Sequence, residues 1–566
     1  MPEITVNKAI VDLLVEAGID HAFGMPGGTT DFLWEEIYLR RQEIKCIITR
    51  HEAAAACMAD MYGRLARKPG VLVGQGPFIG TNGSFGIAEA MYAGSPMLVL
   101  AELSDWYGVN HQAPYQVATG AYGSINLPDI MRSMTKYTAV ADTPGEVPYC
   151  IELAIKHAIS GRPGPAAVLM RWNTLGGRVD LAKVTPKLYP LEGFLRVSPP
   201  SISQPDAVKI AEMLLAAEKP VMITGRGIHA ANAYDELRRL AELVGMPVAT
   251  TYMGKGDIPE THDLALGSLG TLGQKLANQH VGAADVILAI GTCLAPENTD
   301  NLNPKLIDPD RQKLIHVDID PRNAGWTLPV TIGVTSDARL ALQEITKAIQ
   351  RMKLPFDARE RVAALVKQKK DPASDFFQSP YFAKDSTPIN PERVVKVVNE
   401  TIGDNLLVLE SGNARAWFTK LFQTRRPGQI VAGGGMGGMG WGVQGALAAQ
   451  MLLPDQRVFA LMGDGAMMMA LHALNMAKQF SLPIIYLVMN NECMGNIRDY
   501  LRPKCRPYAE TPRVDFAATA RALGIEGLRA DTAGELRNAI ESALASQHAC
   551  LVDINTSQAT HMRIRS

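Results

Sequence analysis

The chain has few of the features that mark secreted, membrane-spanning or nucleic-acid-binding proteins. Its 566 residues include only seven cysteines, an odd number without a CxxC pair, which argues against a disulfide framework and for a reducing compartment. The net charge is only -1, so no excess of basic residues favours nucleic acid. No apolar run is long enough to cross a membrane, and the first residues, MPEIT, do not resemble a signal peptide. We therefore expect a cytoplasmic protein with neither nucleic acid nor a membrane as partner.

The residues that are abundant are those of a globular enzyme. Apolar residues make up 47% of the chain and charged residues 20%, and both values are ordinary for a folded protein. Glycine is frequent, with 50 residues, as expected where many strands turn closely into helices. The length suggests several domains.

Short apolar runs alternate with helical patterns along the whole chain, which predicts an α/β fold. Residues 173–205 are rich in proline, and residues 367–388 are charged and contain proline and serine, so both read as linkers. The sequence thus predicts three doubly wound domains, at 1–175, 195–355 and 375–566.

Residues 457–500 contain the most informative pattern. In order, it consists of an apolar run at 458–462, Gly463-Asp464-Gly465, a helical run at 466–480, an apolar run at 484–489, and Asn490-Asn491. This arrangement predicts a βαβ unit whose two strands are parallel neighbours.

The polar residues of this unit lie where α/β proteins bind ligands, at the carboxyl ends of the strands. Asp464 follows one strand and Asn490-Asn491 the other, while the helix start at Ala466 offers free N–H groups to an anion. One carboxylate and one amide oxygen suit a magnesium ion that takes its other ligands from phosphate and water. The pattern therefore predicts a magnesium–diphosphate site, and the simpler alternative is a structural turn.

A GDG followed by NN after the next strand resembles the thiamine-diphosphate binding motif. In the N-terminal part, the succession Phe23-Gly24-x-Pro26-Gly27-Gly28, Arg50-His51-Glu52 and Thr81-Asn82 resembles the pyrimidine-binding domain of the acetolactate synthase and pyruvate oxidase group. The resemblance extends to 2-oxo acid decarboxylases and covers nearly the whole chain. It implies a pyrimidine-binding, a middle and a diphosphate-binding domain.

Glu52 is the sharpest candidate for a catalytic residue. It begins a helix and precedes four alanines, and burial in such small apolar surroundings would raise its pKa. The alternative is a surface acid that complements a helix N-terminus. The resemblance implies that this glutamate hydrogen-bonds the aminopyrimidine of thiamine diphosphate and drives the ring to its imino form.

The resemblance also implies how the cofactor is held. Magnesium would be bound by Asp464, Asn491 and the backbone carbonyl of Cys493. The cofactor itself would contact Pro26, Gly27, Gly412, Asn413, Gly437, Met439, Gly463, Gly465, Ala466, Met494 and Gly495. It further implies a homodimer or homotetramer, with Glu52 of one subunit facing the diphosphate domain of another.

Two glycine patterns offer nucleotide sites as alternatives. Gly435-x-Gly437-x-x-Gly440 fits the dinucleotide fingerprint, but Asp455 precedes the next strand instead of ending it, which disfavours a nicotinamide cofactor. Gly225-Arg226-Gly227 follows an apolar run, yet no acid ends the next one. In relatives the middle domain holds FAD or nothing, so FAD stays open here. For Met439 the resemblance implies a residue that supports the bent cofactor, whereas composition alone would suggest core packing.

The expected substrate pocket, which comprises Phe78, Tyr122, Gly123, Asn496 and Tyr500, departs from that of acetolactate synthase. Gly123 replaces a glutamine, Asn496 a methionine and Tyr500 a tryptophan, and the loop containing Phe78 is one residue longer. A pocket altered in this way leaves the substrate open.

These observations lead to one hypothesis and several alternatives. We expect a thiamine-diphosphate- and magnesium-dependent lyase or carboligase that acts on a 2-oxo acid or related small carbonyl compound. The alternative enzymes are a 2-oxo acid decarboxylase, a flavin-dependent pyruvate oxidase, and a lyase that acts on 2-hydroxyacyl thioesters or sulfonated aldehydes. The alternative from another class is a non-catalytic scaffold that only retains the fold.

Overall fold

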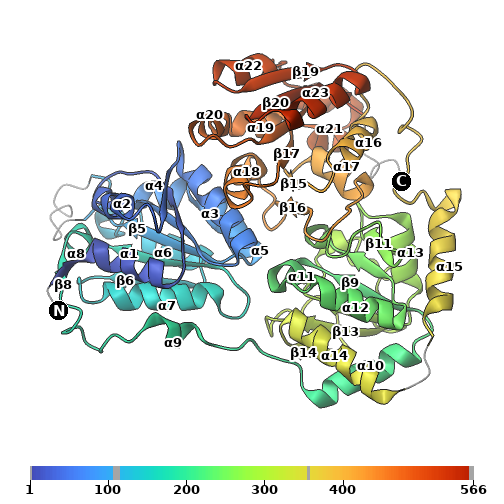
Figure 1. Cartoon of the computed structure of the whole chain (residues 1–566), viewed down its shortest axis with the longest axis horizontal. Coiled ribbons are helices and arrows are strands. Elements are labelled where there is room, and N and C mark those ends of the chain that lie inside the picture. The colour runs from blue at the N-terminus through green and yellow to red at the C-terminus, as the bar shows by residue number, and fades with distance from the viewer. Residues whose placement is uncertain (1–2, 106–114, 354–356, 560–566) are drawn as a thin grey trace. The chain divides into compact units, whose positions relative to one another are not determined.

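The computed structural model describes residues 3–105, 115–353 and 357–559. Its framework consists of three six-stranded sheets in which every strand pair is parallel (Figure 1). Parallel strands need helical crossovers, and helices alternate with the strands throughout. The predicted α/β fold with three doubly wound sheets is confirmed.

The N-terminal sheet has the strand order β3-β2-β4-β5-β7-β6. Its strands are β2 (His21–Gly24), β3 (Lys45–Ile48), β4 (Gly70–Gln75), β5 (Met97–Glu102), β6 (Tyr137–Ala141) and β7 (Pro165–Met170). The helices of this part are α1 (Val6–Glu16), α2 (Thr30–Leu39), α3 (Glu52–Ala66), α4 (Gly76–Thr81), α5 (Ser84–Ala93), η2 (Ala121–Gly123), α6 (Leu127–Met134), α7 (Val147–Ile159), α8 (Trp172–Leu175) and α9 (Leu191–Leu195). A separate antiparallel pair joins β1 (Ile4–Thr5) to β8 (Arg178–Val179).

The middle sheet has the order β11-β10-β9-β12-β13-β14. Its strands are β9 (Pro220–Thr224), β10 (Val248–Thr250), β11 (Ala265–Ser268), β12 (Val286–Ile290), β13 (Lys313–Asp318) and β14 (Ile332–Thr335). Its helices are α10 (Gln204–Ala216), α11 (Arg226–Ala231), α12 (Tyr234–Val244), η3 (Tyr252–Gly254), α13 (Lys275–Ala283), η4 (Pro296–Asn298), α14 (Ala338–Met352), α15 (Arg359–Lys370) and η5 (Pro372–Ser374).

The C-terminal sheet has the order β16-β15-β17-β18-β20-β19. Its strands are β15 (Leu406–Leu409), β16 (Ile430–Ala432), β17 (Val458–Gly463), β18 (Ile485–Asn490), β19 (Glu526–Ala530) and β20 (Cys550–Asn555). The helices of this part of the sequence are α16 (Pro391–Thr401), α17 (Asn413–Leu421), α18 (Trp441–Leu452), α19 (Asp464–Met469), α20 (His472–Gln479), α21 (Gly495–Tyr500), η6 (Pro503–Ala509), α22 (Phe516–Ala522) and α23 (Ala533–Ala545).

The N-terminal and C-terminal sheets share one topology. In both, the strands lie in the order second, first, third, fourth, sixth, fifth along the chain. The chain therefore reverses direction across the sheet between its first and third strands, and ligands of open α/β sheets bind at the carboxyl edge of such a point. In the C-terminal sheet this point lies between β15 and β17.

By their internal contacts the described residues form two compact units. The first contains Met1–Ser198 together with two later segments, Gly433–Asp455 and Ala470–Leu482. The second contains the rest of the chain, including the middle and C-terminal sheets. The boundaries predicted for the three domains stay a prediction.

The βαβ unit predicted at residues 457–500 is confirmed in its strands, because β17 and β18 are parallel neighbours. The single helix predicted at residues 466–480 is wrong, because α19 ends at Met469 and α20 begins at His472. The two helices belong to different units, with Ala470–Leu482 in the first unit and α19 in the second. The chain passes from one unit to the other at this break.

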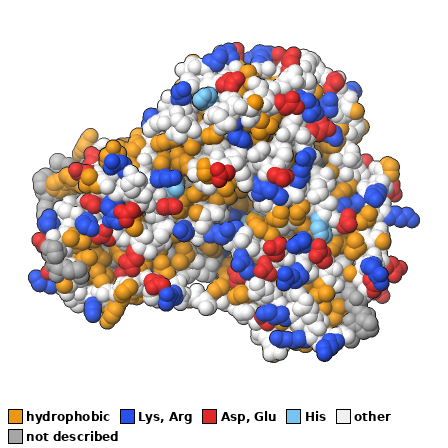
Figure 2. Space-filling view, in the orientation of Figure 1, with side chains coloured by type: hydrophobic (Ala, Val, Ile, Leu, Met, Phe, Trp, Pro, Cys, Tyr) orange, Lys and Arg blue, Asp and Glu red, His pale blue; other side chains and the backbone are white. Residues whose placement is uncertain are grey.

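Charged side chains of both signs are mixed over the face seen in Figure 2, as the near-zero net charge leads one to expect. Among the described residues, no helix combines the length and the apolar character that a membrane span requires.

The second unit contains a buried ion pair whose loss we expect to be costly. Lys255 Nζ lies 2.5 Å from Glu260 Oε1, and the two side chains are 1% and 0% exposed. The other oxygen, Oε2, accepts the N–H of Thr424 at 2.9 Å. Glu260→Ala would leave a buried lysine without its carboxylate, which typically costs about 3–5 kcal/mol.

Chemical unfolding of Glu260→Ala, of Lys255→Met and of the double variant Lys255→Met/Glu260→Leu measures this cost. We expect the double variant to be more stable than Glu260→Ala, because it leaves no buried charge unpaired. Equal stability of Glu260→Ala and the wild type would contradict the assignment.

Candidate functional site

Asp464 is the first residue of α19 and directly follows β17. Its side chain is 8% exposed, and Oδ1 accepts the N–H of Gly465 at 3.0 Å. Burial raises the pKa of this carboxyl to about 6, although backbone N–H groups act in the opposite direction. In the described part of the chain, no lysine or arginine neutralises it. A buried carboxylate without a cationic partner suits a metal ion, which would supply the missing charge.

Asn491 and Asn413 meet at Gly495. Asn491 follows β18, and Asn413 begins α17 after β15. A Cβ added at Gly495 would lie 3.1 Å from Nδ2 of Asn413 and 3.2 Å from Nδ2 of Asn491. The structure thus brings together three residues that the resemblance assigns to the cofactor and its metal, at the carboxyl edge of the sheet, where β17 lies between β15 and β18.

Asp499, in α21, was not predicted from the sequence. Its Oδ2 accepts a hydrogen bond from Asn413 Nδ2 at 2.9 Å, and its side chain is buried. This bond fixes the orientation of the Asn413 amide. The sequence offers no signal for it, because the two residues are 86 positions apart.

The loop after β18 has a constrained backbone. Glu492 adopts the left-handed conformation, with φ 56°, which is costly for a residue with a side chain. Its carbonyl accepts the N–H of Thr511 at 2.9 Å, and Met494 N donates to Ala509 O at 2.8 Å. These bonds tie the loop to the segment around η6.

Cys493 lies at the centre of this loop. Its carbonyl accepts the N–H of Gly495 at 2.9 Å, and its side chain is buried. Burial raises the pKa of the thiol to about 11, so the sulfur stays protonated and is not suited to bind magnesium. Only the backbone carbonyl fits the ligand role that the resemblance implies.

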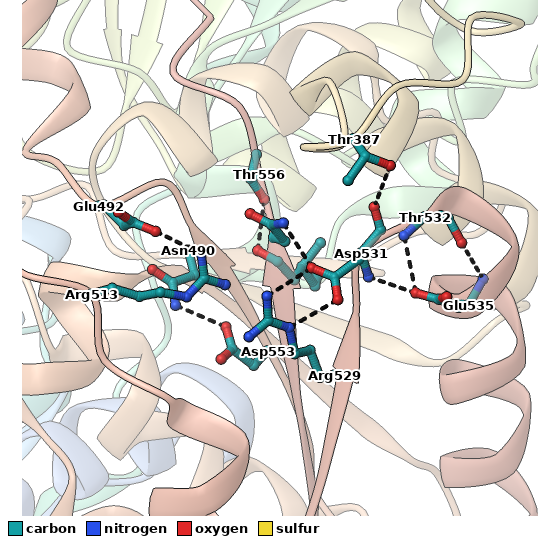
Figure 3. A network of polar contacts seen from close by, with 12 residues as sticks. Thr387, Asn490, Glu492, Arg513, Arg529, Asp531, Thr532, Glu535, Asp553 and Thr556 are labelled. Carbon is teal, nitrogen blue, oxygen red and sulfur yellow. Dashed lines mark hydrogen bonds and ion pairs between the residues drawn. The ribbon is translucent and has the colours of Figure 1, made fainter.

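Asn490 has an anchoring role in a network of polar contacts (Figure 3). Its Nδ2 donates to Asp553 Oδ1 at 2.9 Å and to the carbonyl of Val514 at 3.0 Å. Asp553, in β20, is fully buried, and its Oδ2 accepts the N–H of Phe516 at 3.1 Å. This network joins β18, β20 and the start of α22, and it holds Asn490 by its amide nitrogen.

Figure 3 also shows how Glu492 is held: its carboxylate pairs with Arg513 at 2.6 Å. Nearby, Arg529 pairs with Asp531 at 2.9 Å, and Asp531 accepts a hydrogen bond from Asn555. These pairs fasten the carboxyl ends of β18, β19 and β20. Sequence reasoning missed all of them; Glu492 and Arg513 are 21 positions apart, and Asp531 and Asn555 are 24 positions apart.

Gly412 completes this edge of the sheet. It has φ 87° and ψ -166°, a conformation open essentially to glycine alone. Gly463 ends β17, while Gly465 and Ala466 lie in the first turn of α19, beside Asp464. Met494 precedes α21 and is 46% exposed.

Glu52 lies in the first unit, whereas Asp464 lies in the second. It is half-buried at the start of α3, and its Oε2 accepts a hydrogen bond from Asn82 Nδ2 at 3.0 Å. His51 caps this helix, because its Nδ1 accepts the N–H of Ala53 at 3.1 Å. The hydrogen bond therefore connects the motif Arg50-His51-Glu52 to the motif Thr81-Asn82, both of which carry the resemblance. The role of Glu52 stays a prediction.

The glycine-rich loop at residues 433–440 is occupied by a carboxylate of the same chain. Glu89 Oε1 accepts the N–H groups of Gly434 at 3.1 Å and Gly435 at 3.0 Å. Its Oε2 accepts those of Met436 at 2.7 Å and Gly437 at 3.0 Å. Because these donors are already used, the loop cannot bind the phosphates of a dinucleotide, in agreement with the weak fingerprint.

Glu89 is itself part of a buried ion network. Arg64 Nη2 lies 2.8 Å from Glu89 Oε1 and 2.8 Å from Asp60 Oδ2. Asp60 also accepts a hydrogen bond from the indole N–H of Trp441 at 2.7 Å. Burial would raise the pKa of Glu89, but Arg64 and the backbone N–H groups lower it to about 2. Glu89 is therefore charged at neutral pH.

The loop continues to Met439, which is half-buried. Gly437 and Gly440 have φ 73° and 96°, so both need glycine. A Cβ added at Gly438 would lie 2.1 Å from the Phe85 ring, which leaves no space for a side chain there.

The predicted pocket residues lie in both units. Phe78 is 36% exposed in α4, and Gly123 ends η2 with φ 76°. Tyr122 also lies in η2, and its side chain lies outside the described residues. Asn496 and Tyr500 are exposed on α21. Pro26 and Gly27 follow β2, Pro26 exposed and Gly27 half-buried.

The chain matches three domain families, all of which belong to thiamine pyrophosphate enzymes. "Thiamine pyrophosphate enzyme, N-terminal TPP binding domain" matches residues 4–121. "Thiamine pyrophosphate enzyme, central domain" matches residues 207–345, and "Thiamine pyrophosphate enzyme, C-terminal TPP binding domain" matches residues 410–554.

Several proteins are similar over nearly the whole length of this chain. The "Probable acetolactate synthase large subunit" of Methanocaldococcus jannaschii is 30% identical, covering 97% of this chain and 91% of the relative. The "Acetolactate synthase isozyme 3 large subunit" of Escherichia coli (strain K12) is 27% identical, covering 99% and 96%. The "Acetolactate synthase, chloroplastic" of Arabidopsis thaliana is 28% identical, covering 96% and 80%.

The Glu89 network predicts that one carboxylate orders the glycine-rich loop. Glu89→Ala would leave four N–H groups without their acceptor and would remove one of the two carboxylates that pair with the buried Arg64. We expect a loss of stability of about 3–5 kcal/mol, the usual cost of breaking a buried pair. Backbone amides of residues 433–440 should also exchange faster, as measured by hydrogen–deuterium exchange.

The control is Glu35→Ala, which removes an exposed glutamate in the same unit. It should leave both the stability of the protein and the amide exchange of residues 433–440 unchanged. Normal exchange of the loop in Glu89→Ala would show that the loop is ordered by other contacts.

Proposed function

The chain belongs to the thiamine pyrophosphate enzyme family, and on that premise we propose a thiamine-diphosphate- and magnesium-dependent lyase or carboligase. Its substrate would be a 2-oxo acid or a related carbonyl compound, with bond making or breaking at the carbon next to the carbonyl. The observation that carries this proposal is the convergence of Asn413, Asn491 and Gly495 at the strand edge that also bears Asp464.

The chemistry of the donor set supports magnesium. Asp464 Oδ, Asn491 Oδ1 and the carbonyl of Cys493 are all oxygen donors, which magnesium prefers. Only Asp464 is charged among them, so the site needs further anionic ligands, as a diphosphate would provide. Among the described residues, no cationic side chain neutralises Asp464 and would compete with the metal.

Thiamine diphosphate, when bound, supplies a carbanion that adds to the carbonyl and an electron sink for the bond that breaks. This chain's part is to bind it, to orient it and to move a proton. Glu52 would hold a hydrogen bond to the aminopyrimidine ring, and Asn82 Nδ2 keeps the Glu52 carboxyl in place at 3.0 Å. Met439 would support the cofactor on the loop that Glu89 orders.

Carboligation is the direction that the relatives favour, since those compared are named acetolactate synthases. We expect the substrate pocket to differ from that of acetolactate synthase at Gly123, Asn496 and Tyr500, so the relatives do not fix the donor and acceptor substrates. Simple decarboxylation of a 2-oxo acid and cleavage of a 2-hydroxyacyl thioester are the alternative outcomes of the same chemistry.

The topology of the middle sheet supports FAD as a second candidate cofactor. Its strand order is that of a dinucleotide-binding fold, with the reversal between β9 and β12. At this point Gly227 N donates to Gly291 O at 2.9 Å, so the two turns are in direct backbone contact. A yellow purified protein with flavin absorbance would support FAD and a pyruvate oxidase activity.

We also propose a homodimer or homotetramer with active sites at subunit interfaces. The names of several relatives as large subunits support an assembly. All seven cysteines are free, which supports a reducing compartment such as the cytoplasm.

The metal site predicts a strict dependence of cofactor binding on Asp464. Asp464→Ala removes the only charged protein ligand, so thiamine diphosphate should bind at least roughly ten-fold more weakly in magnesium. Isothermal titration with and without EDTA measures this. Asp404→Ala, an exposed acid of the same unit, should bind as the wild type does. Tight binding without magnesium would refute the site.

Glu52→Gln should retain the fold and the cofactor but lose turnover by about 100-fold or more, a typical loss for a proton-transfer group. NMR analysis of products from pyruvate, with and without an added aldehyde, measures it. Acetolactate or a mixed acyloin from the wild type establishes a carboligase, and free acetaldehyde a decarboxylase. Unchanged turnover in Glu52→Gln would refute its role, and unconsumed pyruvate would point to another donor.

A further inference from the structure

A second polar cluster lies at the carboxyl edge of the N-terminal sheet. β4 ends at Gln75 and β5 at Glu102, and these two residues are direct neighbours in the sheet. In the shared topology, β4 and β5 correspond to β17 and β18, which carry Asp464 and Asn490-Asn491. The cluster thus lies at the same type of strand edge as the proposed metal site. The proposed function gives it no role.

The cluster is built on a buried carboxylate. Glu102 is 1% exposed, and its Oε1 accepts a hydrogen bond from the Ser104 hydroxyl at 2.7 Å. Its Oε2 accepts the N–H of Ser104 at 2.5 Å. Glu102 also lies against the loop after β2, because a Cβ added at Gly28 would be 2.8 Å from Oε1.

A chain of hydrogen bonds links Glu102 to Ser104, Gln75 and Gln116. Because Ser104 uses its hydroxyl hydrogen for Glu102, its oxygen can only accept, and Gln75 Nε2 donates to it at 3.3 Å. The same nitrogen donates to Gln116 Oε1 at 2.8 Å. The orientations of both amides are therefore set by the buried carboxylate.

Two residues of the cluster have a strained backbone. Ser104 has φ 50° and Gln116 has φ 56°, although neither is a glycine. Such conformations cost of order 1–3 kcal/mol each and gather at ligand-binding sites. Strain at both residues indicates that the positions of their side chains matter.

The bonding pattern leaves one acceptor on Gln75 and one donor on Gln116, on two amides that are joined by a hydrogen bond. Within the described parts of the chain, Gln75 Oε1 receives no hydrogen bond and Gln116 Nε2 makes none. Gln75 Oε1 faces the loop that contains Pro26 and Gly27, since a Cβ added at Gly27 would lie 3.3 Å from it. Gln116 is exposed. The pair can therefore be reached by a small molecule.

We propose that Gln75 and Gln116 form a specificity site for a hydroxyl group of the substrate, in an inference that rests on the proposed function. A hydroxyl donates and accepts at once, so it can bond to Gln75 Oε1 and Gln116 Nε2 together. A methyl group does neither and would leave both amides unpaired, which disfavours its binding. The substrate class is a hydroxylated carbonyl compound, such as a 3-hydroxy-2-oxo acid, with the parent 2-oxo acid as the poorer substrate.

The test compares hydroxypyruvate with pyruvate on the protein loaded with thiamine diphosphate and magnesium. Saturation-transfer NMR measures binding, and the rate of loss of each acid gives KM and kcat. We expect a lower KM for hydroxypyruvate in the wild type. Gln75→Leu and Gln116→Gly should each raise that KM about ten-fold or more and leave the KM for pyruvate unchanged; glycine suits the left-handed conformation at residue 116.

Gln42→Leu, at an exposed glutamine of the same unit, is the matched control and should change neither KM. Thermal unfolding and the affinity for thiamine diphosphate should stay at wild-type values in all three variants. Equal effects on both acids, or no binding of hydroxypyruvate to the loaded wild type, would overturn this inference and leave the proposed chemistry standing. Failure of the wild type to bind thiamine diphosphate with magnesium would refute both.

Discussion

The carboxylate of Glu89 is the constraint on which the first unit depends. It is fully buried, accepts four consecutive backbone N–H groups of the glycine-rich loop, and pairs with the buried Arg64. Because an unpaired charge or N–H group is costly in such a place, each partner needs the others. Together with the packing of α18 on α3, this interaction holds Gly433–Asp455 in the first unit, although the segment is far from the N-terminal helices in sequence.

In the second unit, the candidate site separates residues that face a ligand from residues that hold them. Asp464 and Asn491 have side-chain oxygens suited to a metal ion. Asn490, in contrast, is bonded to the buried Asp553, and Glu492 is held in a left-handed conformation with its side chain paired to Arg513. Rigid anchoring of this kind gives the ligand groups a fixed geometry before the cofactor arrives, which lowers the cost of binding.

The N-terminal and C-terminal sheets show how one topology supports two chemistries. Both place the ends of their third and fourth strands at the same edge. In the C-terminal sheet these ends bear Asp464 and the two asparagines, which suit a cation and a diphosphate. In the N-terminal sheet they bear Gln75 and Glu102, which orient amides for a neutral polar group. The fold fixes where a ligand binds, and the side chains at the strand ends decide which ligand it is.

The sequence by itself determined the α/β class, the parallel pairing of β17 with β18, and the candidates Asp464, Asn491 and Glu52, because strand–turn–helix patterns and their end residues are local. Only the tertiary structure decided that the expected helix at 466–480 breaks where the chain changes unit. It also decided that Asn490 is an anchor, and that Glu89 fills the apparent nucleotide loop. The last two facts depend on contacts between residues 63 and 348 positions apart, and a linear sequence does not show which buried carboxylate meets which donor.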